Sequence, residues 1–195
     1  MRIADKNTDD SVFVIAEIGN NHEGNEERAA KMIEAAAKAG ADAVKFQTFR
    51  TELFQSRLPD EARFDSLRSF ELSHEAFSRL AHVAARNNVL FFSTPLDLES
   101  ARFLDTLAPC FKVASSDNDF WQLLDLLAST GKPLILSSGL SDLEGIRKSR
   151  SFIERIWTEK GIRQELAILH CVTCYPVPPE QANLASIPFL REKLG

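Results

Sequence analysis

Short apolar runs alternate with longer amphipathic stretches along the chain, and this alternation constrains the fold more than any other feature. Each run is nearly continuous in apolar residues, which is typical of strands covered on both faces in a parallel sheet. The runs lie at 12–16, 43–46, 89–92, 110–114, 134–136 and 166–169. The sequence therefore predicts an α/β protein built from about six successive strand-and-helix units, with right-handed crossovers.

The helices between these runs carry capping residues that predict where they begin. Asn25, Ser73, Asp97 and Ser141 each precede an amphipathic stretch and can cap its first turn. Two more helices are expected over 120–129 and from about 185 onward. The connection 48–72 is long for a compact domain, so it is predicted to be a lid or binding loop, or else a surface insertion.

The charge balance bears on possible partners. The 195 residues contain 23 Lys and Arg against 28 Asp and Glu, a formal net charge of −5. A nucleic-acid-binding face usually shows as a basic excess, so no nucleic-acid partner is expected. No apolar run approaches the roughly 20 residues of a membrane span, and three cysteines without a secretion signal suggest reduced thiols. We therefore expect a cytoplasmic protein that does not bind membranes.

Polar residues follow each apolar run, where the carboxyl ends of parallel strands form the active face of such folds. Lys45 and Lys112 stand out, because a lysine in a strand buried on both faces is costly unless an anion meets it. The pair predicts a site for a small anion such as phosphate or carboxylate. Alternatively, each lysine pairs with a local carboxylate, such as Glu17 or Asp117.

The two carboxylates have alternative roles of their own. Glu17 and Asp117 could be general acid or base groups, or simple ion-pair partners. His22, in a loop rich in Asn and Gly, is expected to face the site rather than the core.

Several of these segments resemble the signature motifs of the sialic acid synthase family, in the same order and spacing. They are 13–24, 44–48, 92–95, 111–115, 136–139, 169–171 and 175–176. The resemblance implies a TIM-type (β/α)8 barrel, of which about six units are present. Residues 1–195 would be its N-terminal portion, without strands seven and eight and without the antifreeze-like domain common in the family.

The family condenses phosphoenolpyruvate with N-acetylmannosamine or a related amino sugar and releases phosphate. Carried over by position, the resemblance implies that Lys45 and Thr94 hold the phosphoenolpyruvate carboxylate and that Lys112, Ser115 and Ser137 hold its phosphate. Glu17, Gln47 and Tyr175 would face the reacting centre and the sugar. Two positions depart from the family pattern, namely Asp117, where relatives often have Glu, and Thr173, where some have Asn. These departures affect the sugar contacts and one phosphate contact.

The family also uses a divalent metal, Mn²⁺ or Mg²⁺, to polarise the sugar aldehyde. Its ligands lie beyond residue 195 in relatives, so no metal ligand is expected in this chain, and the chain alone is expected to be inactive. Relatives are often homodimers, which makes a homodimer possible here. Two alternatives remain: an aldolase that forms a Schiff base through Lys45 or Lys112, and a truncated barrel that binds a ligand without turnover.

Overall fold

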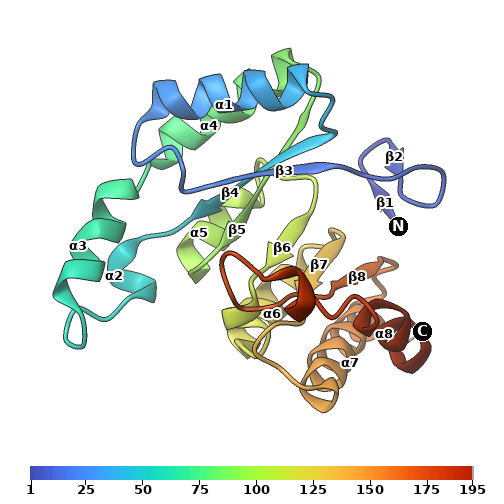
Figure 1. Cartoon of the computed structure of the whole chain (residues 1–195). Coiled ribbons are helices and arrows are strands. Elements are labelled where there is room, and N and C mark those ends of the chain that lie inside the picture. Colours follow the sequence, from blue (N-terminus) through green and yellow to red (C-terminus); the bar gives the residue numbers. More distant parts are fainter. Residues whose placement is uncertain (195) are drawn as a thin grey trace. The chain divides into compact units, whose positions relative to one another are not determined.

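The computed structural model describes residues 1–194, which divide into two compact units with a boundary after Phe111. Figure 1 labels the elements of both. Those of the first unit are β1 (Arg2–Ile3), β2 (Lys6–Asn7), β3 (Ile15–Gly19), α1 (Glu26–Lys38), β4 (Ala43–Thr48), α2 (Thr51–Phe54), α3 (Glu61–Phe70), α4 (His74–Arg86), β5 (Leu90–Pro95) and α5 (Leu98–Leu104). β6 (Phe111–Val113) begins at the boundary. The second unit continues with η1 (Ser115–Asp117), α6 (Trp121–Ser129), β7 (Leu134–Ser137), α7 (Leu143–Lys160), β8 (Leu166–Leu169), η2 (Pro179–Gln181) and α8 (Ser186–Leu194).

The strands confirm the predicted α/β class with parallel pairing. β3, β4 and β5 form one sheet in that order, and both of its strand pairs are parallel. β6, β7 and β8 form a second three-stranded sheet in which β7 and β8 are parallel. The closed barrel and the count of six units stay predictions, because the strands are organised as these two sheets.

The core of the first unit lies between its sheet and the helices α1 and α4, which run side by side over one sheet face (Figure 1). Phe46 on β4 is fully buried there, with its ring centroid 6.0 Å from that of Phe77 and 5.4 Å from that of Phe91. Side chains alternate between the two faces of a strand, so Lys45 and Gln47 point to the opposite face. The aromatic core therefore determines which side of the sheet carries the candidate site.

Local structure departs from the sequence predictions at the first strand and at the long connection. The predicted strand 12–16 is observed as β3, Ile15–Gly19, while Val12 is 85% exposed, because the parallel register with β4 begins at Ile15. The connection 48–72 is not a loop. It contains α2 and α3, and Asp60 caps α3 by accepting a hydrogen bond from the Arg63 N–H at 2.9 Å.

The predicted caps are correct for three of the four helices. The side chains of Asn25, Ser73 and Asp97 each accept a backbone N–H from the first turn of their helix. The cap of α7 is Asp142 rather than Ser141, since the Asp142 carboxylate accepts the Gly145 N–H at 2.7 Å. Asp and Ser cap equally well, so sequence alone does not separate two adjacent candidates.

Candidate functional site

In the first unit, four of the predicted residues share one face of the sheet. Glu17 pairs in register with Lys45, and Gln47 pairs with Thr94, so all four lie opposite the aromatic core. The Lys45 Nζ donates to Thr94 Oγ1 at 3.2 Å and forms an ion pair with Glu17 Oε2. The Lys45 side chain is 12% exposed, whereas that of Glu17 is 49% exposed. The local ion pair that the sequence left open is therefore present.

Two neighbouring residues shape the end of this face. Gln47 Oε1 accepts a hydrogen bond from Asn20 Nδ2 at 2.7 Å. Gly19 has a φ of +53°, and a Cβ at that position would lie 3.1 Å from Glu17 Oε1. A side chain here would thus strain the backbone and crowd the carboxylate. Asn20 was not predicted as a site residue, although its position directly after β3 was a usable signal.

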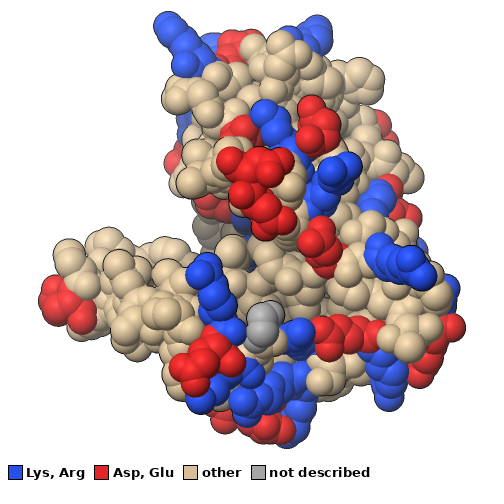
Figure 2. Space-filling view, turned by 90° about the vertical axis from the view of Figure 1, so that its right-hand side faces the viewer, with Lys and Arg blue, Asp and Glu red and all other residues tan. Residues whose placement is uncertain are grey.

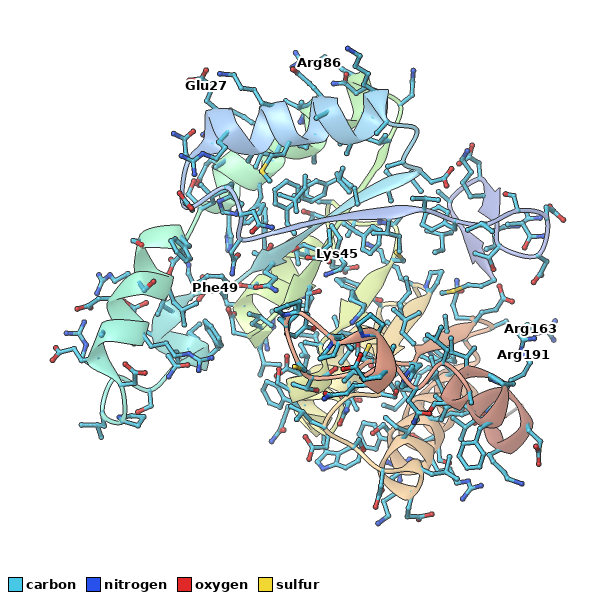
Figure 3. All side chains as sticks on the ribbon, in the orientation of Figure 1. Glu27, Lys45, Phe49, Arg86, Arg163 and Arg191 are labelled. Atoms are coloured by element: carbon cyan, nitrogen blue, oxygen red, sulfur yellow. The ribbon has the colours of Figure 1, made fainter. Side chains whose placement is uncertain are left out.

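Figure 3 shows how the labelled residues of the first unit lie: Lys45 is among the strands, whereas Glu27 and Arg86 project from the outer surface of the helices. Lys45 is thus a sheet residue at the interior of its unit. Most other charged residues lie on the surface, and Figure 2 shows acidic and basic side chains intermixed on the face that it presents. The mostly buried position of the Lys45 ammonium distinguishes it from these solvated charges.

In the second unit, Lys112 is the middle residue of β6 and is 8% exposed. Its Nζ donates to the Val113 carbonyl at 2.8 Å and to the hydroxyl of Ser137 at the end of β7. The Cys171 thiol also lies 3.3 Å from Ser137 Oγ. A mostly buried ammonium beside a hydroxyl is suited to binding an anion, because a negative charge would offset its desolvation.

Small side chains gather beside these groups. A Cβ added at Gly139 would lie 2.6 Å from Ser115 Oγ and 2.9 Å from Thr173 Oγ1. Glycine therefore lets the turn after β7 approach both hydroxyls. The two hydroxyls and the turn backbone, which glycine leaves without a side chain, form a polar surface (the cradle) that fits a phosphate group.

Asn118 organises this cradle and was missed by the sequence analysis. The Asn118 side-chain Nδ2 donates to the Gly139 carbonyl at 2.9 Å and to the Ser137 carbonyl at 3.3 Å. The backbone carbonyl of Asn118 accepts a hydrogen bond from Ser149 Oγ. Asn118 is 4% exposed. An asparagine directly after the polar run 115–117 was the available signal, but only the fold shows that it reaches back to β7.

Asp117 has the electrostatics of an acid–base group. Burial raises the pKa of its carboxyl, and the nearby Asp119 acts in the same direction, while the Ser116 hydrogen bond and the Lys112 charge oppose them. Among the described residues, its Oδ2 has no hydrogen-bond partner. A carboxyl that has a raised pKa and one oxygen without a hydrogen-bond partner is suited to contact a ligand.

Tyr175 and the cysteines lie differently. Tyr175 is 90% exposed, so the contact expected between Tyr175 and a substrate stays a prediction. Cys171 contacts Ser137, whereas Cys174 donates to the Pro176 carbonyl. Within residues 1–194, no group of three or more His, Cys, Asp or Glu side chains could hold a metal ion. The described residues thus do not fit the implied metal.

His22 does not face the site as expected. It is 1% exposed, its ring centroid lies 5.9 Å from that of Phe46, and its Nδ1 accepts the Gly24 N–H at 3.1 Å. The reason is that the turn after β3 folds back toward the helix-covered face of the sheet. Burial lowers the pKa of His22, and the positive charge of Arg28 lowers it further.

This buried imidazole predicts a pH dependence of stability. Below the ordinary histidine pKa of 6.5, the unfolded chain takes up a proton that folded His22 does not. The free energy of unfolding should therefore be constant above that pH and decrease as the pH falls below it. Urea unfolding at a series of pH values from about 7.5 to about 5 would measure this free energy. The His22→Gln variant should show a smaller slope of the free energy of unfolding against pH. The matched control is His82→Gln at an exposed position; an unchanged slope in His22→Gln would contradict the prediction.

The chain is similar to known proteins over most of its length. The NeuB family profile matches residues 32–195. The chain is 36% identical over 192 residues to the spore coat polysaccharide biosynthesis protein SpsE of Bacillus subtilis, covering 93% of this chain and 50% of that protein. It is 31% identical to the N-acetylneuraminate-9-phosphate synthase of Mus musculus, covering 90% of this chain and 50% of the relative.

A solved structure gives the same result. The N-acetylneuraminic acid (sialic acid) synthetase of Leptospira borgpetersenii, in complex with citrate, superposes with a TM-score of 0.82 at 31% identity. The match covers 93% of this chain and 61% of that chain. The chain spans about half the length of the curated relatives named above.

Proposed function

The chain belongs to the NeuB family, and we propose that it carries the phosphoenolpyruvate-binding part of a nonulosonic (sialic) acid synthase. The reaction would join phosphoenolpyruvate to N-acetylmannosamine or a related amino sugar and release phosphate. The relatives whose names specify sialic acid synthesis support this class of reaction. None of the helices over residues 1–194 is long and apolar enough to cross a membrane.

The observation that carries the proposal is the buried Lys112 ammonium beside the Ser137 hydroxyl, next to the Gly139 turn. We assign the phosphate of phosphoenolpyruvate to Lys112, Ser115 and Ser137, with Thr173 as a further hydroxyl donor. In the first unit, we assign the carboxylate to Lys45 and Thr94. An ammonium with flanking hydroxyls matches the charge and hydrogen-bonding capacity of each anionic group.

The remaining residues are assigned to the chemistry at the reacting carbons. Carbon 3 of phosphoenolpyruvate attacks the sugar aldehyde, and carbon 2 becomes cationic. Water adds to carbon 2 and gives a tetrahedral intermediate. Loss of phosphate from this intermediate gives the keto acid product. We assign Glu17 to stabilise the cation or accept a proton from the water, and Gln47, Asp117 and Tyr175 to contact the sugar. No step is assigned to a metal, because the described residues do not form a metal site.

The ion pair of Lys45 favours this proposal over a Schiff-base aldolase that uses Lys45, whereas it does not bear on one that uses Lys112. A Schiff-base lysine needs a neutral amine, and such lysines lie in apolar pockets or beside another cation. Lys45 instead contacts the Glu17 carboxylate. Lys45 is therefore bonded to a carboxylate rather than placed in an apolar pocket or beside another cation.

Calorimetry on the purified chain tests the proposal through binding, which does not require turnover. Phosphoenolpyruvate should bind to the chain, and inorganic phosphate should compete with it. Absence of phosphoenolpyruvate binding, together with a pyruvate adduct trapped on a lysine by borohydride, would establish the aldolase instead. Absence of both would leave a protein that binds a different ligand.

A further inference from the structure

Two carboxylates, one buried and one mostly buried, hold the chain just after β4, at Arg50 and Thr51, which lie five and six residues beyond the candidate site residue Lys45. Asp97, after β5, is 3% exposed and accepts the Arg50 N–H at 2.8 Å. Glu71, after α3, accepts the Thr51 N–H at 2.9 Å and the Thr51 hydroxyl at 3.0 Å. Neither residue belongs to the candidate site described above.

Asp97 ties the end of β4 to the end of β5. Besides the Arg50 N–H, its carboxylate accepts the N–H and the hydroxyl of Ser100, both at 2.7 Å, and so caps α5. The Leu96 N–H donates to the Thr48 carbonyl at 3.0 Å in the same place. The segments that directly follow Gln47 and Thr94 are therefore bonded to each other.

Glu71 secures the other side of the same segment. The short helix α2 has Arg50 at its cap position, and the Arg50 side chain forms no capping bond. Glu71, 20 residues farther along the chain, satisfies the Thr51 N–H instead, and its other oxygen accepts from the Arg50 guanidinium at 2.9 Å. Thr51 is fully buried, and the Glu71 side chain is 15% exposed, so water cannot readily replace these bonds.

We propose that Glu71 is a positioning residue for the candidate site. It holds the segment of Arg50 and Thr51 next to Asp97. This segment directly follows β4, so the contact keeps Lys45 and Gln47 in place beside Thr94. The proposal rests on the proposed function, because it takes Lys45, Gln47 and Thr94 as ligand-binding side chains. Glu71 itself contacts none of the three. It acts through the backbone of the segment that follows β4, where Phe49 (labelled in Figure 3) is buried and packs on Phe54.

The test compares three variants of the full chain. Glu71→Ala removes the carboxylate that binds Arg50 and Thr51, and Glu61→Ala removes a carboxylate that pairs with the exposed Arg57 on the same segment. Phe64→Ala destabilises α3, where Phe64 is 4% exposed, without altering a residue that bonds to Arg50 or Thr51. The readouts are the Kd for phosphoenolpyruvate, amide exchange at Thr51 and Leu96, and the NMR signal of the Gln47 side-chain amide.

We expect Glu71→Ala to raise the Kd about tenfold, to speed exchange at both amides and to shift the Gln47 signal. Glu61→Ala should change none of these readouts. Phe64→Ala should lower the melting temperature at least as much as Glu71→Ala and leave the Kd and the Gln47 signal unchanged.

Two results would overturn the proposal: an unchanged Gln47 signal in Glu71→Ala, or the same loss of affinity in Phe64→Ala as in Glu71→Ala. Failure of the proposed function is separate, since it would appear as absence of phosphoenolpyruvate binding by the unaltered chain. The exchange rates and the Gln47 signal would still decide whether Glu71 controls the end of β4.

Discussion

Replacing Lys112 with Met should weaken the binding of phosphoenolpyruvate and of inorganic phosphate by at least about 10²-fold, while the protein remains folded. Lys112 is 8% exposed, so an anion that reaches it meets an ammonium with little solvent screening. Met has a similar length and fills the same space, but it carries neither the charge nor the N–H donors to Ser137 and Val113. Isothermal titration calorimetry with each ligand measures the effect.

The control for Lys112→Met is Lys148→Met, on the exposed surface of α7 in the same unit. It removes the same charge from the protein's total and should leave both affinities unchanged. The melting temperature of Lys112→Met should stay close to that of the unaltered chain, because the removal of a buried charge offsets the loss of the hydrogen bonds to Ser137 and Val113. Phosphate binding by Lys112→Met at the unaltered affinity would show that the phosphate site lies elsewhere.

Replacing Lys45 with Met should also weaken phosphoenolpyruvate binding about 10²-fold. The reason differs from that for Lys112→Met, and so does the expected effect on phosphate binding. We assign Lys45 to the carboxylate, so inorganic phosphate should bind to Lys45→Met as it does to the unaltered chain. The variant also leaves Glu17 without its ammonium partner. Because Glu17 is about half exposed, the loss of stability should be no more than about 1 kcal/mol.

A second substitution separates these two effects of Lys45→Met. Adding Glu17→Gln removes the unpaired carboxylate, so the double variant should regain stability by a coupling of about 0.5–1 kcal/mol. It should not regain phosphoenolpyruvate affinity, since glutamine supplies no cation for the substrate carboxylate. Recovery of affinity in the double variant would mean that Lys45 acts only as the structural partner of Glu17.

The sequence predicted the site residues on the sheets better than those in the connections. Lys45 and Lys112 were identifiable because a lysine inside a strand covered on both faces is costly unless an anion meets it. Asn118 and Glu71 were not, because each forms its hydrogen bonds with residues about 20 positions away. His22 shows the opposite error: its neighbours in sequence are polar, but the turn after β3 folds its ring against Phe46.

The alternation of the main strands and helices, the α/β class and the family membership follow from the sequence by itself, since periodicity, caps and ordered motifs are local properties of a chain, whereas α2 and α3 were not predicted. Only the tertiary structure decided the partners of the charged groups. It paired Lys45 with Glu17, held Lys112 by neutral oxygens and placed Glu71 at the start of α2. The physical reason is that hydrogen bonds and ion pairs depend on distances of a few ångströms, which are set by how the elements pack rather than by their spacing along the chain.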